Sequence, residues 1–109
     1  MATIYLVQGD TGPQLRLEFI DTYTGEPTNL QGAMVYLHFR AVDTTTLLFT
    51  RQAIVQAPAS NGVAILVWGQ DDLNQAAGDY EGEIEVILSS GIRETQFDLL
   101  QFTIREDFG

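Results

Sequence analysis

The sequence predicts an all-β protein, a sandwich of about seven antiparallel strands. Apolar residues recur at every second position through most of the 109 residues, which is the side-chain period of a strand. Glycine, proline and asparagine clusters separate these stretches at the spacing typical of a sandwich. The composition is 45% hydrophobic with no cysteine, so a core is expected to hold without disulfides. This length suits one core, and we therefore expect a single domain over residues 1–109.

The N-terminal half contains four expected strands. They cover approximately residues 3–8, 14–21, 33–42 and 47–56. In the third, Val35, Leu37 and Phe39 share one face, which is expected to point inward. Alternation is poor in the fourth, and this favours a bulge or an edge position. The segment 22–29 is rich in turn-forming residues and is expected to be a surface loop.

The C-terminal half is expected to contain a strand near residues 63–68, a second from Tyr80 to Leu88, and a return strand over 92–105 with a break near Asp98. Asp71 to Ala77 is the one segment typical of a helical turn, because Gly78 is placed to end it. The expected fold therefore has one short helical turn near residues 71–77 among its strands.

The net charge of the chain limits the kinds of partner that we expect. Fifteen acidic residues against five basic ones give a formal net charge of -10. A surface of this sign repels phosphate backbones and anionic membranes, so we expect neither nucleic acid nor membrane as a partner. The first residues lack the basic start and apolar run of a signal peptide, and no stretch approaches about 18 apolar residues. We therefore expect a soluble protein made in the cytoplasm.

Tyr80 is our candidate for a tyrosine corner. It opens a strand directly after the turn-rich segment that ends at Gly78, which is where immunoglobulin-like sandwiches place a tyrosine whose hydroxyl bonds back to the preceding loop. In antibody domains a cysteine follows two residues later, whereas this chain has Gly82. The position predicts an immunoglobulin-like sandwich without the inter-sheet disulfide.

Four short segments carry a wider resemblance. They are Asp10-Thr11-Gly12-Pro13 before Leu15-Arg16-Leu17, Asn29-Leu30-Gln31-Gly32-Ala33 before Val35, Ala77-Gly78-Asp79-Tyr80 before an acidic strand, and Gly91-Ile92-Arg93-Glu94-Thr95 followed by Phe102-Thr103-Ile104. Together they cover nearly the whole chain, and they resemble the N-terminal immunoglobulin-like domain of phage baseplate upper proteins. That family belongs to the tail and baseplate of tailed bacteriophages.

The resemblance implies a virion structural protein, made in the host cytoplasm, that docks onto other virion proteins and onto itself as a homo-oligomer. No long coiled or receptor-binding segment follows Arg105, which departs from the usual setting of the family. Besides the tail and baseplate, capsid decoration, a head-tail connector and a tail cap therefore stay open as positions.

The inventory of catalytic residues is nearly empty. Nucleophilic catalysis needs a nucleophile, a base and an orienting group, and this chain has no cysteine and one histidine. His38 lies within a strand on the face opposite the expected core, so we expect a surface or interface residue. A hydrolase with paired carboxylates needs two acids facing one cleft, and no spacing singles out such a pair. We therefore expect a protein that is not an enzyme.

No cofactor or metal is expected either. Asp71 and Asp72 could offer oxygens to calcium, but the spaced ligands of a calcium loop are absent, so capping of a helical turn is favoured. The turn Gly9-Asp10-Thr11-Gly12 has no helix behind it to bind phosphate. Both segments are interpreted as structural.

Two groups of residues are candidates for partner contact. Glu81, Glu83 and Glu85 project from one strand face, and their like charges crowd unless Arg40, Arg51 or Arg93 pairs with them. A solvated, partly paired face is favoured over an acidic docking face. The candidate anchors near mobile segments are Tyr23 and Glu26 in the loop and Phe108 in the tail.

A carbohydrate-binding or host-adhesion module is the alternative function. It requires Trp68, Tyr23 and Tyr36 to form an exposed aromatic surface. Trp68 at a strand end is more typical of a core residue, because a buried indole contributes a large apolar area. The exposure of Trp68 therefore separates the two hypotheses.

Overall fold

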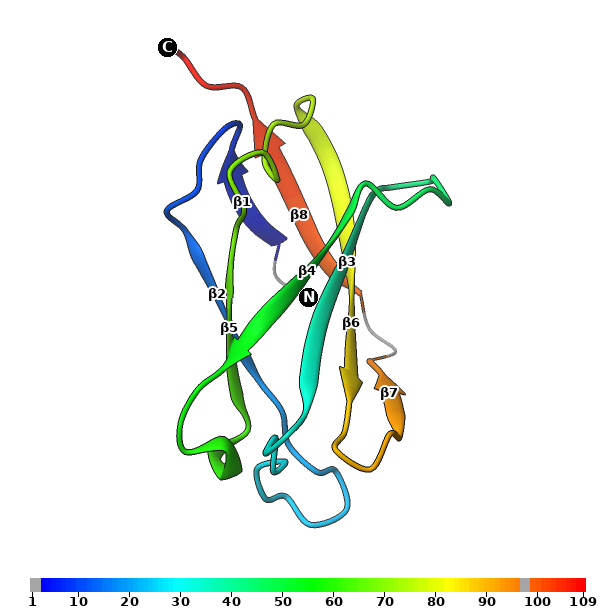
Figure 1. The fold of residues 1–109 in the computed structure, drawn as a ribbon. Helices are drawn as coiled ribbons and strands as arrows, with labels where there is room; N and C mark the ends of the chain where they lie inside the picture. Colours follow the sequence, from blue (N-terminus) through cyan, green and yellow to red (C-terminus); the bar gives the residue numbers. More distant parts are fainter. Residues whose placement is uncertain (1–2, 97–98) are drawn as a thin grey trace.

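The computed structural model describes residues 3–96 and 99–109, and across them the chain is built from strands and one 3-10 turn (Figure 1). This confirms the all-β prediction. The elements are β1 Thr3–Val7, β2 Gln14–Glu18, β3 Met34–Ala41, β4 Phe49–Val55, the 3-10 turn η1 Ala59–Asn61, β5 Val63–Val67, β6 Gly78–Ile87, β7 Arg93–Thr95 and β8 Leu100–Arg105. No helix in the described ranges has the length and apolar character to cross a bilayer.

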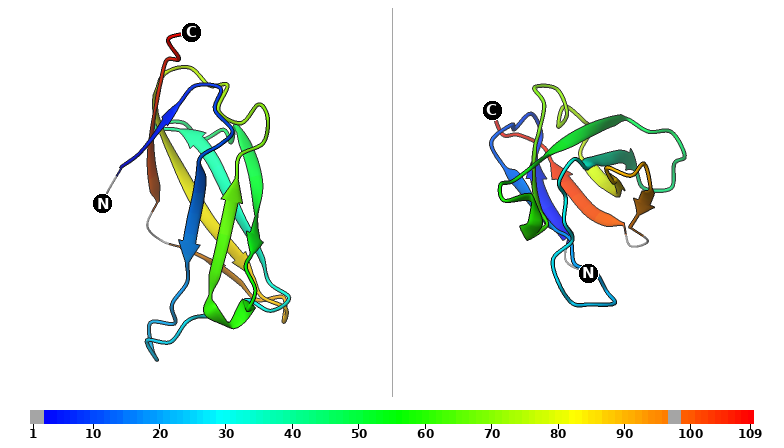
Figure 2. Two further views of the ribbon diagram at one scale, coloured as in Figure 1. Left: turned by 90° about the vertical axis from the view of Figure 1, so that its left-hand side faces the viewer. Right: turned by 60° about the horizontal axis from the view of Figure 1, so that its bottom comes forward.

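The strands form one curled sheet that folds over into two layers. Its order is β1-β8-β6-β3-β4-β5-β2, and β7 pairs with the end of β6. Figure 2 shows β2 and β5 lying across β3 and β6, so the curl closes an immunoglobulin-like sandwich around one interior.

One pairing departs from the expected antiparallel sandwich. β1 runs parallel to β8, from Thr3 opposite Gln101 to Val7 opposite Arg105. A hairpin forces its two strands to be antiparallel, but the first and last strands share no hairpin and are free to run in the same direction. The sheet is therefore mixed.

β4 links the two layers. Its residues Phe49 to Ala53 pair with β3, and Ile54 and Val55 then pair with β5. A strand that passes from one layer to the other turns different faces inward along its length, so its apolar residues cannot alternate regularly. The poor alternation in this region thus reflects a corner between layers, and not the expected bulge or edge.

The helical turn expected near residues 71–77 is not present. The Asp72 amide bonds to the Gly69 carbonyl and the Asn74 amide to the Asp71 carbonyl, which closes two tight turns without a helix. Leu73 is buried in the core here, and its burial fixes the path of the segment. The 3-10 turn η1 lies earlier, in the connection between β4 and β5.

The return strand after the hairpin is divided into β7 and β8. β8 pairs with the first half of β6, whereas β7 pairs with Glu85, Val86 and Ile87 near its end. This division raises the strand number from about seven to eight. The expected break near Asp98 lies outside the described residues.

The core lies between the layers and is rich in aromatic rings. Val35, Leu37 and Phe39 of β3 have no exposed area, as their alternation predicts. The Phe39 ring centroid is 5.2 Å from those of both Tyr80 and Phe102, and 6.0 Å from that of Trp68. Trp68 is only 4% exposed and is therefore a core residue. Each such side chain contributes about 1.5–3 kcal/mol through burial.

Candidate docking surface

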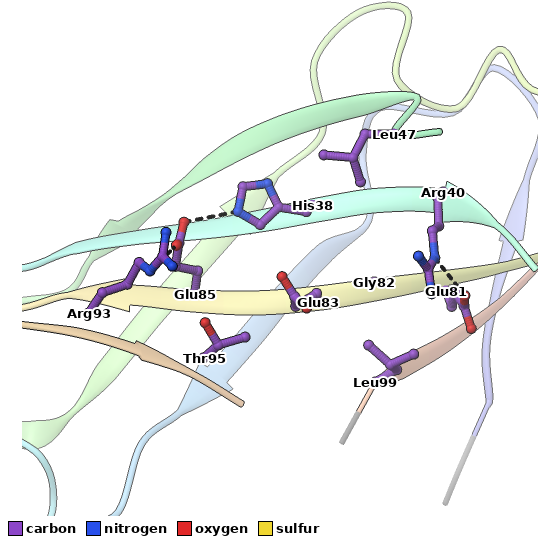
Figure 3. Close-up of a pocket in the computed structure, with 10 residues that line it drawn as sticks. All are labelled: His38, Arg40, Leu47, Glu81, Gly82, Glu83, Glu85, Arg93, Thr95 and Leu99. Carbon is purple, nitrogen blue, oxygen red and sulfur yellow. Dashed lines mark hydrogen bonds and ion pairs between the residues drawn. The ribbon is translucent and has the colours of Figure 1, made fainter. Parts of the chain in front are cut away.

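The acidic strand β6 borders a groove on the surface of the sheet (Figure 3). The groove has a volume of about 490 Å³ and lies over the outer face of β3, β6 and β7. Alternation in β6 turns Tyr80, Gly82 and Ile84 inward and the three glutamates outward. The lining residues are His38, Arg40, Leu47, Glu81, Gly82, Glu83, Glu85, Arg93, Thr95 and Leu99.

Two of the three glutamates are paired. The Arg40 Nε donates to Glu81 Oε1 at 2.7 Å. Glu85 is shared, because its Oε1 lies 3.0 Å from His38 Nε2 and its Oε2 lies 3.2 Å from Arg93 Nε. The other ring nitrogen of His38, Nδ1, lies 2.8 Å from Thr50 Oγ1. The single histidine is thus part of a polar network on the outer face of the sheet.

Glu83 has a different environment. It is exposed and lies between the two paired glutamates in the groove (Figure 3). In the part of the chain that the structure describes, it forms no ion pair. The face is therefore partly paired, with one negative charge turned toward solvent and with Leu47 and Leu99 as apolar walls.

Arg51 does not pair with the glutamates. Its Nε donates to Asp72 Oδ2 at 2.7 Å, and its Nη2 donates to Oδ1 at 2.5 Å. The Gly69 amide also donates to Asp72 Oδ2, at 2.7 Å. Burial of Asp72 opposes its ionisation, but the hydrogen bonds from Arg51 and Gly69 together outweigh this effect and lower the pKa of the carboxyl group. The hydrogen bond to Asp72 likewise raises the pKa of Arg51.

The Asp71-Asp72 pair therefore does not cap a helix. Asp72 caps the turn at Gly69 and holds β4 through Arg51, while exposed Asp71 accepts a hydrogen bond from Asn74 Nδ2 at 3.1 Å. Across residues 3–96 and 99–109, no group of three or more histidine, aspartate or glutamate side chains is arranged to hold a metal ion.

Tyr80 makes the contact that defines a tyrosine corner. Its hydroxyl donates to the Ala76 carbonyl at 2.5 Å, and the side chain is 6% exposed. Burial raises the pKa of the Tyr80 hydroxyl. A Cβ atom on Gly82 would lie 2.5 Å from Leu37 Cδ1 and 3.0 Å from Phe102 Cε2. Core side chains thus fill the space that the cysteine would need in a disulfide-bonded domain.

The candidate anchors are exposed but far apart. Tyr23 is 98% exposed and Phe108 is 94% exposed, and Glu26 is exposed as well. The loop with Tyr23 and Glu26 lies at the end of the molecule opposite the C-terminal tail (Figure 1). The Arg105 guanidinium carbon lies 4.9 Å from the centre of the Phe108 ring. The structure does not bring the anchors together, so they belong to two separate surfaces.

Some surface features gave no signal in the sequence. Leu47 and Leu99 line the groove from irregular segments, where no periodicity marks them. Arg16 and Glu18 lie on the free edge of β2, because β2 pairs only with β5 among the described strands. Their alternation with Leu15 and Leu17 predicts a strand but not its place at the edge of the sheet.

The comparisons with known proteins identify the fold. No protein-family model and no curated protein sequence matches the chain. CopC from Methylosinus trichosporium OB3b is similar in structure, with a TM-score of 0.56 and 16% identity over 100% of this chain and 89% of that chain. The N-terminal domain of phage TP901-1 ORF48 is similar with a TM-score of 0.55 and 19% identity, over 97% of this chain and 85% of that chain. At these identities, the likeness establishes a shared fold alone.

Proposed function

We propose that this chain is a non-catalytic structural protein of a tailed-phage virion that acts by docking onto other virion proteins. The observation that carries the proposal is the agreement between two independent likenesses. The sequence segments resemble the N-terminal domain of phage baseplate upper proteins, and the fold resembles the N-terminal domain of phage TP901-1 ORF48 over 97% of this chain.

The described surface supports a role in docking. A groove lies on the outer sheet face, and the charged groups there are mostly engaged with one another. His38 has a partner at each ring nitrogen, Thr50 at Nδ1 and Glu85 at Nε2, so the imidazole is fixed within the polar network of this face. The exposed aromatic side chains Tyr23 and Phe108 at opposite ends suit contacts with two different neighbours.

We further propose a position in the tail or baseplate, because the resemblance is to that part of the particle. Capsid decoration and a head-tail connector are the competing positions. The carbohydrate-binding alternative loses its support, because Trp68 is 4% exposed and cannot join Tyr23 and Tyr36 in an aromatic surface. A glycan platform of these three residues would need Trp68 on the outside.

The test is the content of purified particles. Particles of the phage whose genome encodes this chain would be isolated on a density gradient, washed at high salt and analysed by quantitative mass spectrometry. We expect the chain at a fixed copy number relative to the tail proteins. Recovery only in the unbound lysate fraction would contradict the proposal. Antibody labelling in electron microscopy then separates a tail or baseplate position from the capsid surface.

A further inference from the structure

The free edge of β2 is one of the places where a further strand can join the described sheet. The sheet path ends in β1 on one side and β2 on the other, and short β7 lies off this path. An unpaired edge presents backbone N–H and C=O groups to an incoming strand. β1 carries no charged residue and β7 has three residues, whereas β2 carries two opposite charges.

The register shows which backbone groups of β2 face outward. The Phe19 amide donates to the Gly62 carbonyl at 2.8 Å, and Leu17 lies opposite Ala64 in the same register. Backbone groups in an antiparallel pair alternate between the two edges of a strand. The groups of Leu15 and Leu17 therefore face β5, as the Phe19 amide does, while the Phe19 carbonyl accepts a hydrogen bond from the Thr28 amide at 2.9 Å. Those of Gln14, Arg16 and Glu18 point toward the free edge.

The side chains of Arg16 and Glu18 are also available. They project from the same face of β2, with 58% and 54% of their surface exposed. They lie two residues apart and contact each other within the chain. An intramolecular pair with this exposure is easily exchanged for an intermolecular one, because exposed ion pairs contribute little free energy.

We infer that the β2 edge binds the β2 edge of a second copy of this chain, antiparallel and about a twofold axis at Leu17. In this register Arg16 lies opposite Glu18 of the second copy, and Glu18 lies opposite its Arg16. Both positions direct their backbone groups outward, so they form the hydrogen-bonded pairs of the new ladder. The edge is thus complementary to itself in backbone bonding and in charge, as a twofold interface requires.

The same register extends to the ends of the strand. Gln14 lies opposite Ile20 of the second copy, and Ile20 is 58% exposed in the single chain. A short ladder of this kind buries little area, so the dimer is expected to be weak and reversible in solution. The inference goes beyond the proposed function, in which the chain docks onto other virion proteins.

The test is charge reversal followed by mixing. Sedimentation equilibrium would compare the wild-type chain with Arg16→Glu, with Glu18→Arg and with an equimolar mixture of the two variants. Each variant alone places like charges opposite each other twice, so we expect association to weaken about tenfold. In the mixture, the acidic edge of one variant meets the basic edge of the other, and association should return to the wild-type level.

The mixture separates contacts between copies from contacts within one. Both variants have lost the Arg16–Glu18 pair inside the chain, so recovery on mixing cannot come from that pair. Arg105→Glu, which changes the net charge as Arg16→Glu does but lies at the end of β8, is the matched control and should associate like the wild type. A wild-type chain that stays monomeric to millimolar concentration, or a mixture without recovery, would overturn the inference.

The register has its own test, because the chain contains no cysteine. Gln14→Cys and Ile20→Cys would be oxidised separately and mixed. Opposed Cα atoms in a hydrogen-bonded pair lie about 5.5 Å apart, within reach of a disulfide. We expect a cross-linked dimer chiefly in the mixture, and equal cross-linking in each variant alone would refute this register. The two proposals can fail separately. If the chain is monomeric but present in virions, only the dimer inference is wrong. If the chain dimerises but is absent from virions, only the proposed function is wrong.

Discussion

The Tyr80 hydroxyl joins the start of β6 to the turn before it, through the Ala76 carbonyl. Tyr80→Phe keeps the buried ring and removes this bond, so we expect the free energy of unfolding to fall by about 1 kcal/mol. The measurement is the urea midpoint at pH 7. Tyr5→Phe is the matched control, because Tyr5 is 78% exposed and its midpoint should not move. Equal midpoints for all three chains would refute a stabilising corner.

The ion pair between Arg51 and Asp72 makes stability depend on pH. The pKa of Asp72 is lower in the folded chain than in the unfolded one, so folding favours the ionised carboxylate. Its contribution is complete above the unfolded pKa, which is about 4, and is lost as the pH falls through the folded pKa.

Asp72→Asn should therefore destabilise the protein by about 2 kcal/mol at pH 7, because hydrogen bonds to a charged group are removed. The difference from the wild type should shrink as the pH falls below about 4, since the wild-type carboxyl is then protonated too. Urea unfolding from pH 7 down to pH 3 measures this difference in the free energy of unfolding. Asp71→Asn is the control, because Asp71 is the exposed neighbour of Asp72. If the stability difference between the wild type and Asp72→Asn did not change with pH, the lowered pKa of Asp72 would be contradicted.

At the scale of the elements, Gly62 holds β2, β5 and the segment at Thr28 in contact. Its φ is +70°, and a Cβ atom there would lie 2.5 Å from the Phe19 carbonyl oxygen and 2.9 Å from that of Thr28. Both neighbours are backbone atoms, and moving them aside would disturb the hydrogen bonds from the Phe19 amide to the Gly62 carbonyl and from the Thr28 amide to the Phe19 carbonyl. The junction therefore requires glycine for its conformation and for its space.

We expect Gly62→Ala to cost about 3 kcal/mol or more, because strain and steric overlap add together. Gly91→Ala is the matched control, since its φ is +89° but no atom lies within 4 Å of the added Cβ. That variant should cost only about 1 kcal/mol, which is the strain of the left-handed conformation alone. Thermal unfolding of both chains measures the difference, and similar losses would show that the close approach carries no cost.

Elements with one buried face were the most predictable. β3 alternates strictly because one of its faces lies against the core along the whole strand, and Tyr80 follows a recognisable turn. β4 was less predictable, since it serves two layers. The segment from Asp71 to Ala77 has the composition of a helical turn, but the burial of Leu73 and the ion pair of Asp72 with Arg51 determine its path. Those contacts come from distant parts of the chain.

At the scale of the whole molecule, the proposed docking would use the two ends that carry the exposed aromatic residues Tyr23 and Phe108. Tyr23→Ala and Phe108→Ala should leave the unfolding midpoint unchanged, because both side chains are almost fully exposed. If each end contacts a neighbour, each variant should lower incorporation into particles about tenfold. Tyr5→Ala on β1 is the control for loss of an exposed tyrosine elsewhere. Normal incorporation of both variants would remove these residues from the interface.

The candidate surface was only partly predictable. The alternation of Glu81, Glu83 and Glu85 predicts a common face, and the structure confirms that arrangement. Which arginine pairs with which acid depends on strand order, so Arg51 was not separable from Arg40 and Arg93 in the sequence. The groove walls and the free edge of β2 also depend on strand order, which periodicity does not encode.

The parallel pairing of β1 with β8 bears on how the chain is made. Among the described strands β1 pairs only with β8, Leu100–Arg105, so β1 cannot pair until about 95 further residues have been synthesised. Before that segment is synthesised, Leu6 lacks the strand that pairs with β1. Tyr80 likewise lacks Phe102, its partner on β8. Contacts of such long sequence separation slow folding. Completion of this sandwich therefore requires synthesis of β8, and a chain released before β8 would retain an open, aggregation-prone flank.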